Sequence, residues 1–189
     1  MEKNMTKSGI VYVVRYSGAF GYIKPWTAVR DAKTYSQSFL TPSIIEGMRQ
    51  KLEVSKILRH RIFHFGLDTQ QERTQSAGWK MERKQMSRQL SIIERGIMLQ
   101  PILTLAFETP QDAINASTQH ICLCRNEDIL LPFETYEMTV ANFDTLPGIE
   151  LIFEHTEESF LVGYNRFDNS CPMYGHLLIV DENLEGIEG

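Results

Sequence analysis

The apolar positions in the first third of the chain predict a strand followed by a helix. Residues 10–16 are β-branched or aromatic at almost every position, which is typical of a strand. The apolar residues after a Thr-Pro-Ser sequence have helical spacing, so we expect a helix with Thr41 as N-cap and Pro42 at its first position, ending near Glu53. Gly47 costs about 1 kcal/mol inside such a helix relative to alanine, which suggests that another backbone or a ligand packs close to it.

The next segment changes from apolar to polar. Residues 54–66 alternate like a second strand, whereas residues 68–89 are rich in Gln, Arg, Lys and Ser. This polar stretch cannot form a core, and it is longer than the loops that usually connect elements of a compact domain. We therefore predict a projecting hairpin arm with a basic cluster at Lys80, Arg83, Lys84 and Arg88.

The second half of the chain repeats the order strand, helix, strand. Residues 91–109 return to strand with interruptions at Gly96 and Pro101, and Pro110 starts a short helix. Further strands are predicted around residues 133–140, 149–155, 160–164 and 177–180. The repeated order is that of a ferredoxin-like α+β sandwich, the fold type of RNA-recognition modules whose open sheet face binds single-stranded RNA. We expect a single domain over residues 1–189, with residues 68–89 inserted as the arm.

Composition agrees with one compact domain. The chain has 189 residues, of which 42% are hydrophobic, and no apolar run is long enough to span a bilayer. Because residues 1–9 are polar and lack the apolar region of a secretory signal, we expect a cytoplasmic protein with no membrane contact. Cys122, Cys124 and Cys171 are odd in number and lack zinc-site spacing, so we expect buried, reduced thiols and no metal or cofactor.

The net charge of −5 conceals an uneven distribution along the chain. Residues 1–100 contain 17 Lys and Arg against 8 Asp and Glu, whereas residues 101–189 contain 2 against 16. The first half would attract a polyanion, and the second half would repel one. Two surfaces with different partners would explain this split, although a chance excess on solvated faces would give the same counts.

The sequence has none of the short motifs of common active sites. GxSxG, HExxH, Walker A and GxGxxG are all absent. His60 and His64 have the spacing of a metal pair on a helix, but on the predicted strand they lie about 13 Å apart. We interpret them as partly exposed structural histidines and expect no catalytic site.

Aromatic and cationic residues instead alternate in the first strand and the loop after it. The set comprises Tyr12, Arg15, Tyr16, Phe20, Tyr22, Lys24, Trp26, Arg30, Lys33 and Tyr35. Aromatic rings stack on bases at about 1–3 kcal/mol each, and cations add a salt-sensitive phosphate term. The start of the helix at residues 41–43 offers free N–H groups and a hydroxyl to a phosphate. In the alternative interpretation, strand aromatics such as Tyr12 belong to the core and loop cations such as Lys24 are merely solvated.

Four segments carry a resemblance to a known family. Residues 16–25 (YSGAFGYIKP) and 38–47 (SFLTPSIIEG) resemble the N-terminal signature of the CRISPR-associated Cas-five family, which belongs to the RAMP superfamily of RNA-binding proteins. Residues 94–101 (ERGIMLQP) and 122–127 (CLCRNE) are similar to its second half, with Cys124 where glycine is usual. The most specific piece of the resemblance is Thr41 to Gly47.

The resemblance implies a non-catalytic subunit of a type I CRISPR surveillance complex (Cascade), acting in antiviral defence or RNA-guided DNA targeting. Such subunits use a ferredoxin-like RAMP domain with a hairpin thumb, cap the backbone and hold the 5′ handle of the crRNA. The implied partners are the crRNA, the backbone subunit and the large subunit, with target DNA met through the complex. The implied RNA-binding residues are Lys24, Trp26, Arg30, Tyr35, Thr41, Ser43, Arg49 and Arg125, together with Lys80, Arg83, Lys84 and Arg88 on the arm. The acidic second half would then contact protein.

One branch of the family is a metal-independent endoribonuclease that processes CRISPR precursor RNA. A tyrosine ahead of the Thr-Pro-Ser turn and a Lys-His pair are implicated in its cleavage. Here Phe39 and Leu40 precede the turn, and the chain has no Lys-His dipeptide. Cleavage is therefore the alternative function, with Tyr35 and His60 as the residues that leave it open.

Overall fold

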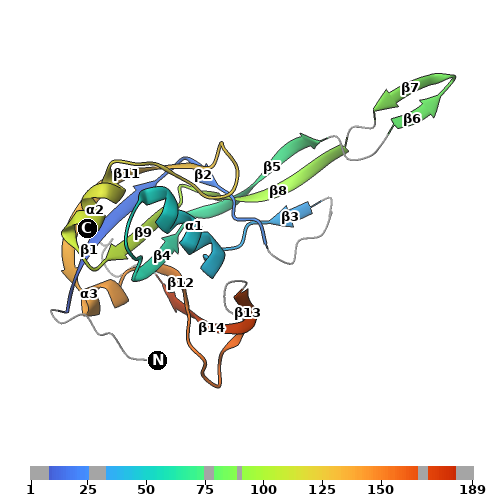
Figure 1. Ribbon diagram of the computed structural model, residues 1–189. Coiled ribbons are helices and arrows are strands. Elements are labelled where there is room, and N and C mark those ends of the chain that lie inside the picture. Colours follow the sequence, from blue (N-terminus) through green and yellow to red (C-terminus); the bar gives the residue numbers. More distant parts are fainter. Residues whose placement is uncertain (1–8, 26–32, 75–78, 89–90, 166–169, 182–189) are drawn as a thin grey trace, which may run out of the picture.

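The computed structural model describes residues 9–25, 33–74, 79–88, 91–165 and 170–181 (Figure 1). Within them, an eight-stranded antiparallel sheet forms the body in the order β10-β11-β1-β9-β4-β12-β14-β13. In that order the strands are Ile121–Cys122, Ile129–Thr139, Ile10–Ser17, Ile102–Phe107, Arg59–Phe63, Gly148–Ile152, Cys171–Val180 and Phe160–Asn165. No helix in the described ranges has the length and apolar character needed to cross a membrane.

Three helices cover parts of the two sheet faces. Helices α1 (Pro42–Leu52) and α2 (Pro110–Ser117) pack on one face, where Val14 belongs to the larger core. Helix α3 (Val140–Asp144) packs on the other face, where Val13 contacts the smaller core around Phe143. Because successive strand residues point to opposite faces, β1 contributes to both cores. The predicted order β1–α1–β4 followed by β9–α2–β11 is confirmed, and so are the additional C-terminal strands.

Proline determines where both longer helices begin. Thr41 is the N-cap of α1 with Pro42 after it, and Thr109 is the N-cap of α2 with Pro110 after it. Proline has a fixed φ and no N–H, so it suits the first helical position, where an N–H would have no partner within the helix. The C-cap of α1 is Glu53 at φ 54°, which confirms the predicted end of this helix.

A long ribbon projects from the body and forms an arm over residues 66–99. Strands β5 (Gly66–Thr74) and β8 (Ser91–Leu99) pair antiparallel, and the hairpin of β6 (Trp79–Glu82) and β7 (Gln85–Arg88) lies at its far end (Figure 1). Near the body, β2 (Phe20–Gly21) and β3 (Lys33–Tyr35) also pair with β8. The predicted interruption at Gly96 is wrong, because β8 continues through this residue.

Gly47 and the three cysteines differ from expectation. A Cβ atom at Gly47 would meet no atom within 4 Å, so no backbone of the described chain packs against this glycine, and a ligand at this place stays a prediction. Cys122, Cys124 and Cys171 are unpaired as expected, but all three are exposed instead of buried. The cysteines lie at strand ends and in loops, where the apolar character of a thiol does not decide its burial.

A buried ion pair joins β4 to β12. Arg61 and Glu150 are each 1% exposed, and Nη2 of Arg61 lies 3.1 Å from Oε2 of Glu150. Arg61 also donates to backbone carbonyls within residues 143–146, and Arg59 donates two hydrogen bonds to the same Glu150 carboxylate. Because a buried charge without a partner is strongly unfavourable, this network holds α3 and β12 against the sheet.

Candidate nucleic-acid interface

Hydrogen bonds close the loop that follows β2. The Gln37 N–H donates to the Ile23 carbonyl at 2.9 Å, and the Ile23 N–H donates to Ser36 Oγ at 2.9 Å. Lys24 therefore starts the loop at a defined place, where its side chain is exposed. Trp26 and Arg30, the other predicted RNA-binding residues of this loop, lie outside the described residues.

Tyr35 presents an aromatic ring where the loop returns to the arm. It is 51% exposed, and its ring lies over Gly96 of β8, where a Cβ atom would collide with it. Lys33 Nζ lies 5.4 Å from the centre of the Tyr35 ring and 3.5 Å from a carboxylate oxygen of Glu94. Contact with Tyr35, followed by the Glu94 charge, raises the pKa of Lys33. An exposed ring beside a cation is the arrangement that single-stranded nucleic acid uses for stacking and phosphate contact.

Two tyrosines of the predicted aromatic set are buried instead. Tyr16 is 0% exposed and Tyr22 is 2% exposed. The Tyr16 hydroxyl donates to the Ala116 carbonyl at 2.7 Å, and burial raises the pKa of Tyr16. Tyr12 is half-buried against the core, as the alternative interpretation expected. The core interpretation of the strand aromatics therefore holds for Tyr12, Tyr16 and Tyr22.

The start of α1 keeps its two hydroxyl groups available. Thr41 makes no side-chain hydrogen bond to the helix backbone, and its Oγ1 lies 3.1 Å from Ser43 Oγ instead. Ser43 is exposed and Thr41 is half-buried. Pro42 has no N–H, and the N–H groups of Ile44 and Ile45 both donate to the Thr41 carbonyl at 3.0 Å, so the expected row of free N–H groups is reduced to that of Ser43. The two hydroxyls still lie together, which suits a phosphate oxygen.

Arg49, also predicted to bind RNA, is engaged within its own helix. Its guanidinium donates to both carboxylate oxygens of Glu46, at 2.9 and 2.8 Å, and to the Val54 carbonyl at 3.1 Å. The hydrogen bonds from Arg49 lower the pKa of Glu46 to about 2. Arg49 therefore stabilises the end of α1, and the structure does not place it among the free cations.

Arg125 connects the arm to the body. It donates to both carboxylate oxygens of Asp128, at 2.9 and 2.7 Å, and to Gln70 Oε1 on β5 at 2.9 Å. The Tyr22 ring has the Arg125 guanidinium at 5.3 Å and the Arg95 guanidinium at 5.5 Å. The sequence analysis did not predict these contacts between the arm and the body, because the residues come from four separate segments and no local pattern relates them.

The tip of the arm carries two exposed cations in a strained turn. Arg83 has φ 48° and Lys84 has φ 68°, both in the left-handed region that the two-residue hairpin turn requires. Asn and Gly occupy such positions most easily, so two long cationic residues here are unfavourable for the turn itself.

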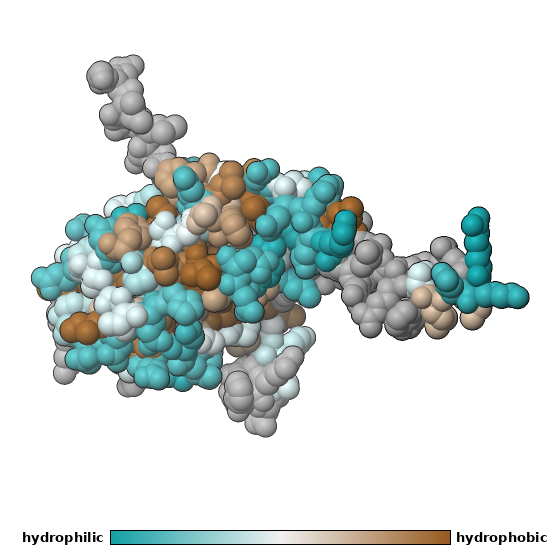
Figure 2. All heavy atoms as spheres, turned by 90° about the horizontal axis from the view of Figure 1, so that it is seen from above, coloured by the Kyte–Doolittle hydropathy of each residue, from teal (hydrophilic) through white to brown (hydrophobic). Residues whose placement is uncertain are grey.

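The strands of the tip hairpin expose apolar side chains as well. Met81 and Met86 face each other across the hairpin and are 71% and 56% exposed. Figure 2 shows hydrophilic side chains projecting at this far end of the molecule. Lys80 and Arg88 lie on β6 and β7, and their side chains are outside the described part.

His60 and His64 differ in how deeply they are buried. His60 is only 4% exposed and stacks on Phe153 at 5.7 Å, so the expectation that it is partly exposed is wrong. Burial lowers the pKa of His60 to about 4 and, to a smaller extent, the pKa of half-buried His64. A buried ring held neutral in this way cannot easily exchange protons with a bound substrate.

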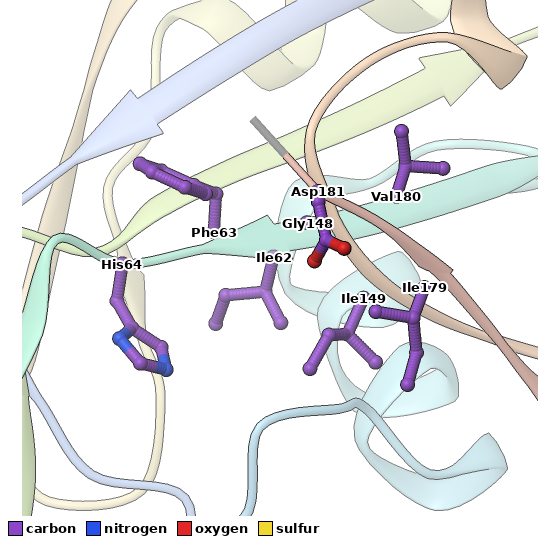
Figure 3. Close-up of a pocket in the computed structure, with 8 residues that line it drawn as sticks. All are labelled: Ile62, Phe63, His64, Gly148, Ile149, Ile179, Val180 and Asp181. Atoms are coloured by element: carbon purple, nitrogen blue, oxygen red, sulfur yellow. The ribbon is translucent and has the colours of Figure 1, made fainter. Parts of the chain in front are cut away.

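One surface depression of the described chain is lined by residues from three strands of the sheet. This open depression of about 180 Å³ lies between the ends of β4, β12 and β14, with Ile62, Gly148 and Asp181 among its lining residues (Figure 3). This volume is below the usual range for small-molecule sites, about 300–1,000 Å³. No cluster of three or more His, Cys, Asp or Glu with metal-site geometry occurs in the ranges that the structure describes.

Comparisons with known proteins found a solved structure with a similar fold. No family model matches the chain, and no curated protein matches its sequence. The structure is similar to a chain of a solved structure titled "CRISPR RNA-guided surveillance complex", with a TM-score of 0.50 and 12% sequence identity. The match covers 90% of this chain and 90% of that chain. The shared feature is therefore the whole sheet-dominated α+β fold and not a single motif.

Proposed function

We propose that this chain is a non-catalytic RNA-binding subunit of a type I CRISPR surveillance complex, a member of the Cas-five family that caps the backbone and holds the 5′ handle of the crRNA. It meets target DNA only through the assembled complex, in antiviral defence or another RNA-guided role. The observation that carries the proposal is the fold similarity over 90% of both chains to a protein from a complex with that title.

The order of the central strands supports the RAMP assignment. Strands β11, β1, β9 and β4 are neighbours, with α1 between β1 and β4 in the chain and α2 between β9 and β11. A ferredoxin-like domain interleaves two strand–helix–strand units in this way, which supports the proposed RAMP fold. The arm over residues 66–99 then corresponds to the thumb of the family.

The distribution of exposed cations supports RNA binding on the loop and arm side. Lys24 and Tyr35 lie at the loop beside Lys33, which pairs with Glu94, and Arg83 and Lys84 lie at the tip. We assign the handle to the loop together with Thr41 and Ser43, and we assign the RNA beyond the handle to the arm. Stacking on Tyr35 and phosphate contacts to the cations would give salt-dependent binding.

Copurification tests the proposal directly. The tagged chain, produced in its source cells and purified at moderate salt, is expected to carry a short RNA of uniform 5′ end together with other subunits. Sequencing that RNA identifies the handle. Purified complexes that contain no RNA, or RNA with random ends, would contradict the proposed function.

The endoribonuclease alternative needs a separate measurement. Burial of His60 and the absence of a Lys-His dipeptide support a protein without cleavage activity. Incubation of the purified chain with CRISPR repeat RNA in EDTA is expected to leave the RNA intact. Cleavage at one position that disappears in Tyr35→Phe would favour the nuclease.

A further inference from the structure

The sheet face opposite α1 and α2 carries a row of apolar side chains near the root of the arm. Leu131 lies opposite Ser17, Ser17 lies opposite Ile102, and Ile102 lies opposite Phe63. Directly opposite residues of antiparallel strands point to the same face, so the row crosses β11, β1, β9 and β4. Val13 of β1 points to this face as well, and it packs against α3 at the other end of the strand.

Two further aromatic rings extend the row. Phe65 follows β4 and packs edge-on against Phe63, with ring centres 5.0 Å apart. The ring of Phe133 lies under the Arg15 guanidinium at 5.1 Å. We call Phe63, Phe65, Ile102, Leu131 and Phe133 the sheet-face patch.

The sheet-face patch is open to solvent. Phe65, Leu131 and Phe133 are 62%, 59% and 52% exposed, and Phe63 and Ile102 are half-buried. Neighbouring apolar side chains exposed to this degree mark an interaction surface more often than isolated ones do. Aromatic rings beside an arginine are also the composition that is enriched in protein interfaces.

The charges around the sheet-face patch indicate whether RNA or protein binds there. The adjacent strands β11, β1, β9, β4, β12 and β14 contain three Lys or Arg residues, which are Arg15, Arg59 and Arg61. Arg15 pairs with Glu134 at 2.7 Å, and the other two pair with Glu150. Asp181, which lines the depression of Figure 3 together with Phe63, adds a further carboxylate to this region.

RNA binding requires cations that are free to contact phosphates, and these strands offer none among their described residues. A neutral to acidic surround favours a partner that brings positive charge. We propose that the sheet-face patch docks another polypeptide, through a segment that presents aliphatic or aromatic side chains flanked by Lys or Arg. This inference goes beyond the proposed function and does not depend on RNA binding by the loop and arm.

Photo-crosslinking in the purified assembly tests the proposal. With p-benzoylphenylalanine in place of Phe133, we expect a crosslink to another polypeptide, mapped by mass spectrometry to an apolar segment with basic flanks. The same crosslinker in place of Ile114, which is 54% exposed on α2, serves as the control and should not reach that segment. A crosslink from position 133 to RNA, a crosslink to a second copy of this chain, or no crosslink would overturn the proposal.

Substitution of exposed patch residues gives an independent measurement. Phe65→Ser with Leu131→Ser should lower recovery of the crosslinked partner about tenfold, because a reduction of about 1.4 kcal/mol in binding free energy has that effect. The melting temperature and the amount of copurified RNA should not change. The control pair Ile114→Ser with Tyr164→Ser replaces residues of similar exposure elsewhere and should leave partner recovery unchanged. Unchanged recovery with the patch variant, or loss of RNA with the partner retained, would overturn the proposal. Absence of RNA from the wild-type assembly would contradict the proposed function alone.

Discussion

Arg61 in the sheet body and Arg83 at the tip of the arm have the same side chain in opposite surroundings. Arg61 is 1% exposed and bound to Glu150 and backbone carbonyls, whereas Arg83 is exposed and has no ion pair within the described chain. The body finds partners for its charges within the fold, so those charges contribute to folding. The strained turn at the tip of the arm leaves Arg83 and Lys84 without an ion pair among the described residues, which is unfavourable for the hairpin alone and useful only with a partner.

The same contrast separates the two proposed surfaces. The loop and arm combine Tyr35 with unburied cations, and the sheet-face patch combines apolar rings with an arginine that is already paired. Net composition could not reveal this difference, because Arg15 and Lys24 count equally in a charge total. Four changes test how far the body and the arm are independent.

The largest effect is expected in the body. Glu150→Ala leaves Arg61 buried without its carboxylate, which should lower the free energy of unfolding by about 3–5 kcal/mol. Urea denaturation measures this change. The control Glu134→Ala breaks an exposed pair with Arg15 and should cost at most about 1 kcal/mol. Equal effects of the two variants would mean that burial does not distinguish these ion pairs.

The pH dependence of stability should come from the body as well. The folded-state pKa of His60 is lowered from 6.5 to about 4 by burial, so the unfolded chain binds the proton more readily between these values. The stability that neutral His60 provides is complete above pH 6.5 and is lost as the pH falls toward 4. Between pH 7 and pH 5 the loss should be about 2 kcal/mol, since one pKa unit corresponds to about 1.4 kcal/mol.

Glu150, Arg59 and Arg61 also act on the charge of His60, so a comparison of variants isolates its share. His60→Leu should flatten the profile over this range, as measured by urea unfolding at several pH values. A profile as steep as that of the wild-type protein would assign the dependence to other groups.

Substitution of Tyr35 is expected to have a smaller effect, which lowers the affinity for RNA and leaves the stability of the protein unchanged. Tyr35→Ala should weaken binding of the handle RNA by about 1–3 kcal/mol, because a base loses its stacking partner. Tyr35→Phe keeps the ring and should bind normally in fluorescence anisotropy. Tyr164→Ala, which removes a tyrosine of similar exposure on β13, is the matched control. If Tyr164→Ala lowered the affinity for RNA as much as Tyr35→Ala does, the loss would not be specific to the loop.

The smallest effect is expected at the tip of the arm. Arg83→Asn with Lys84→Gly relieves the left-handed strain, so the hairpin should become more stable while RNA binds about tenfold more weakly. The slope of affinity against salt should fall by about 1.4, because each phosphate that a cation neutralises on a single strand adds about 0.7 to that slope. Lys51→Ala with Lys56→Ala removes two exposed charges from the body side and should leave the slope unchanged. A tip variant with the wild-type slope would place the RNA away from the arm.

Local signals predicted the elements well. The Thr41-Pro42 and Thr109-Pro110 pairs predicted both helix starts, because capping and proline geometry act within a few residues. The polar composition of residues 68–89 predicted a projecting segment, although the paired ribbon extends from Gly66 to Leu99. The roles of individual side chains were harder to predict. Arg49 and Arg125 have the composition of an RNA contact, and both are bound to carboxylates of their own chain.

The sequence alone determined the β1–α1–β4 and β9–α2–β11 order, the starts of α1 and α2, and the charge difference between the halves of the chain. These properties depend on periodicity, backbone geometry and residue counts, which are all local or additive. The tertiary structure alone decided that Tyr22 is buried near two guanidiniums, that Tyr35 is exposed over Gly96, and that the cations of the sheet are paired. Burial and pairing depend on which distant segments meet when the strands register, and no short window of sequence contains both partners.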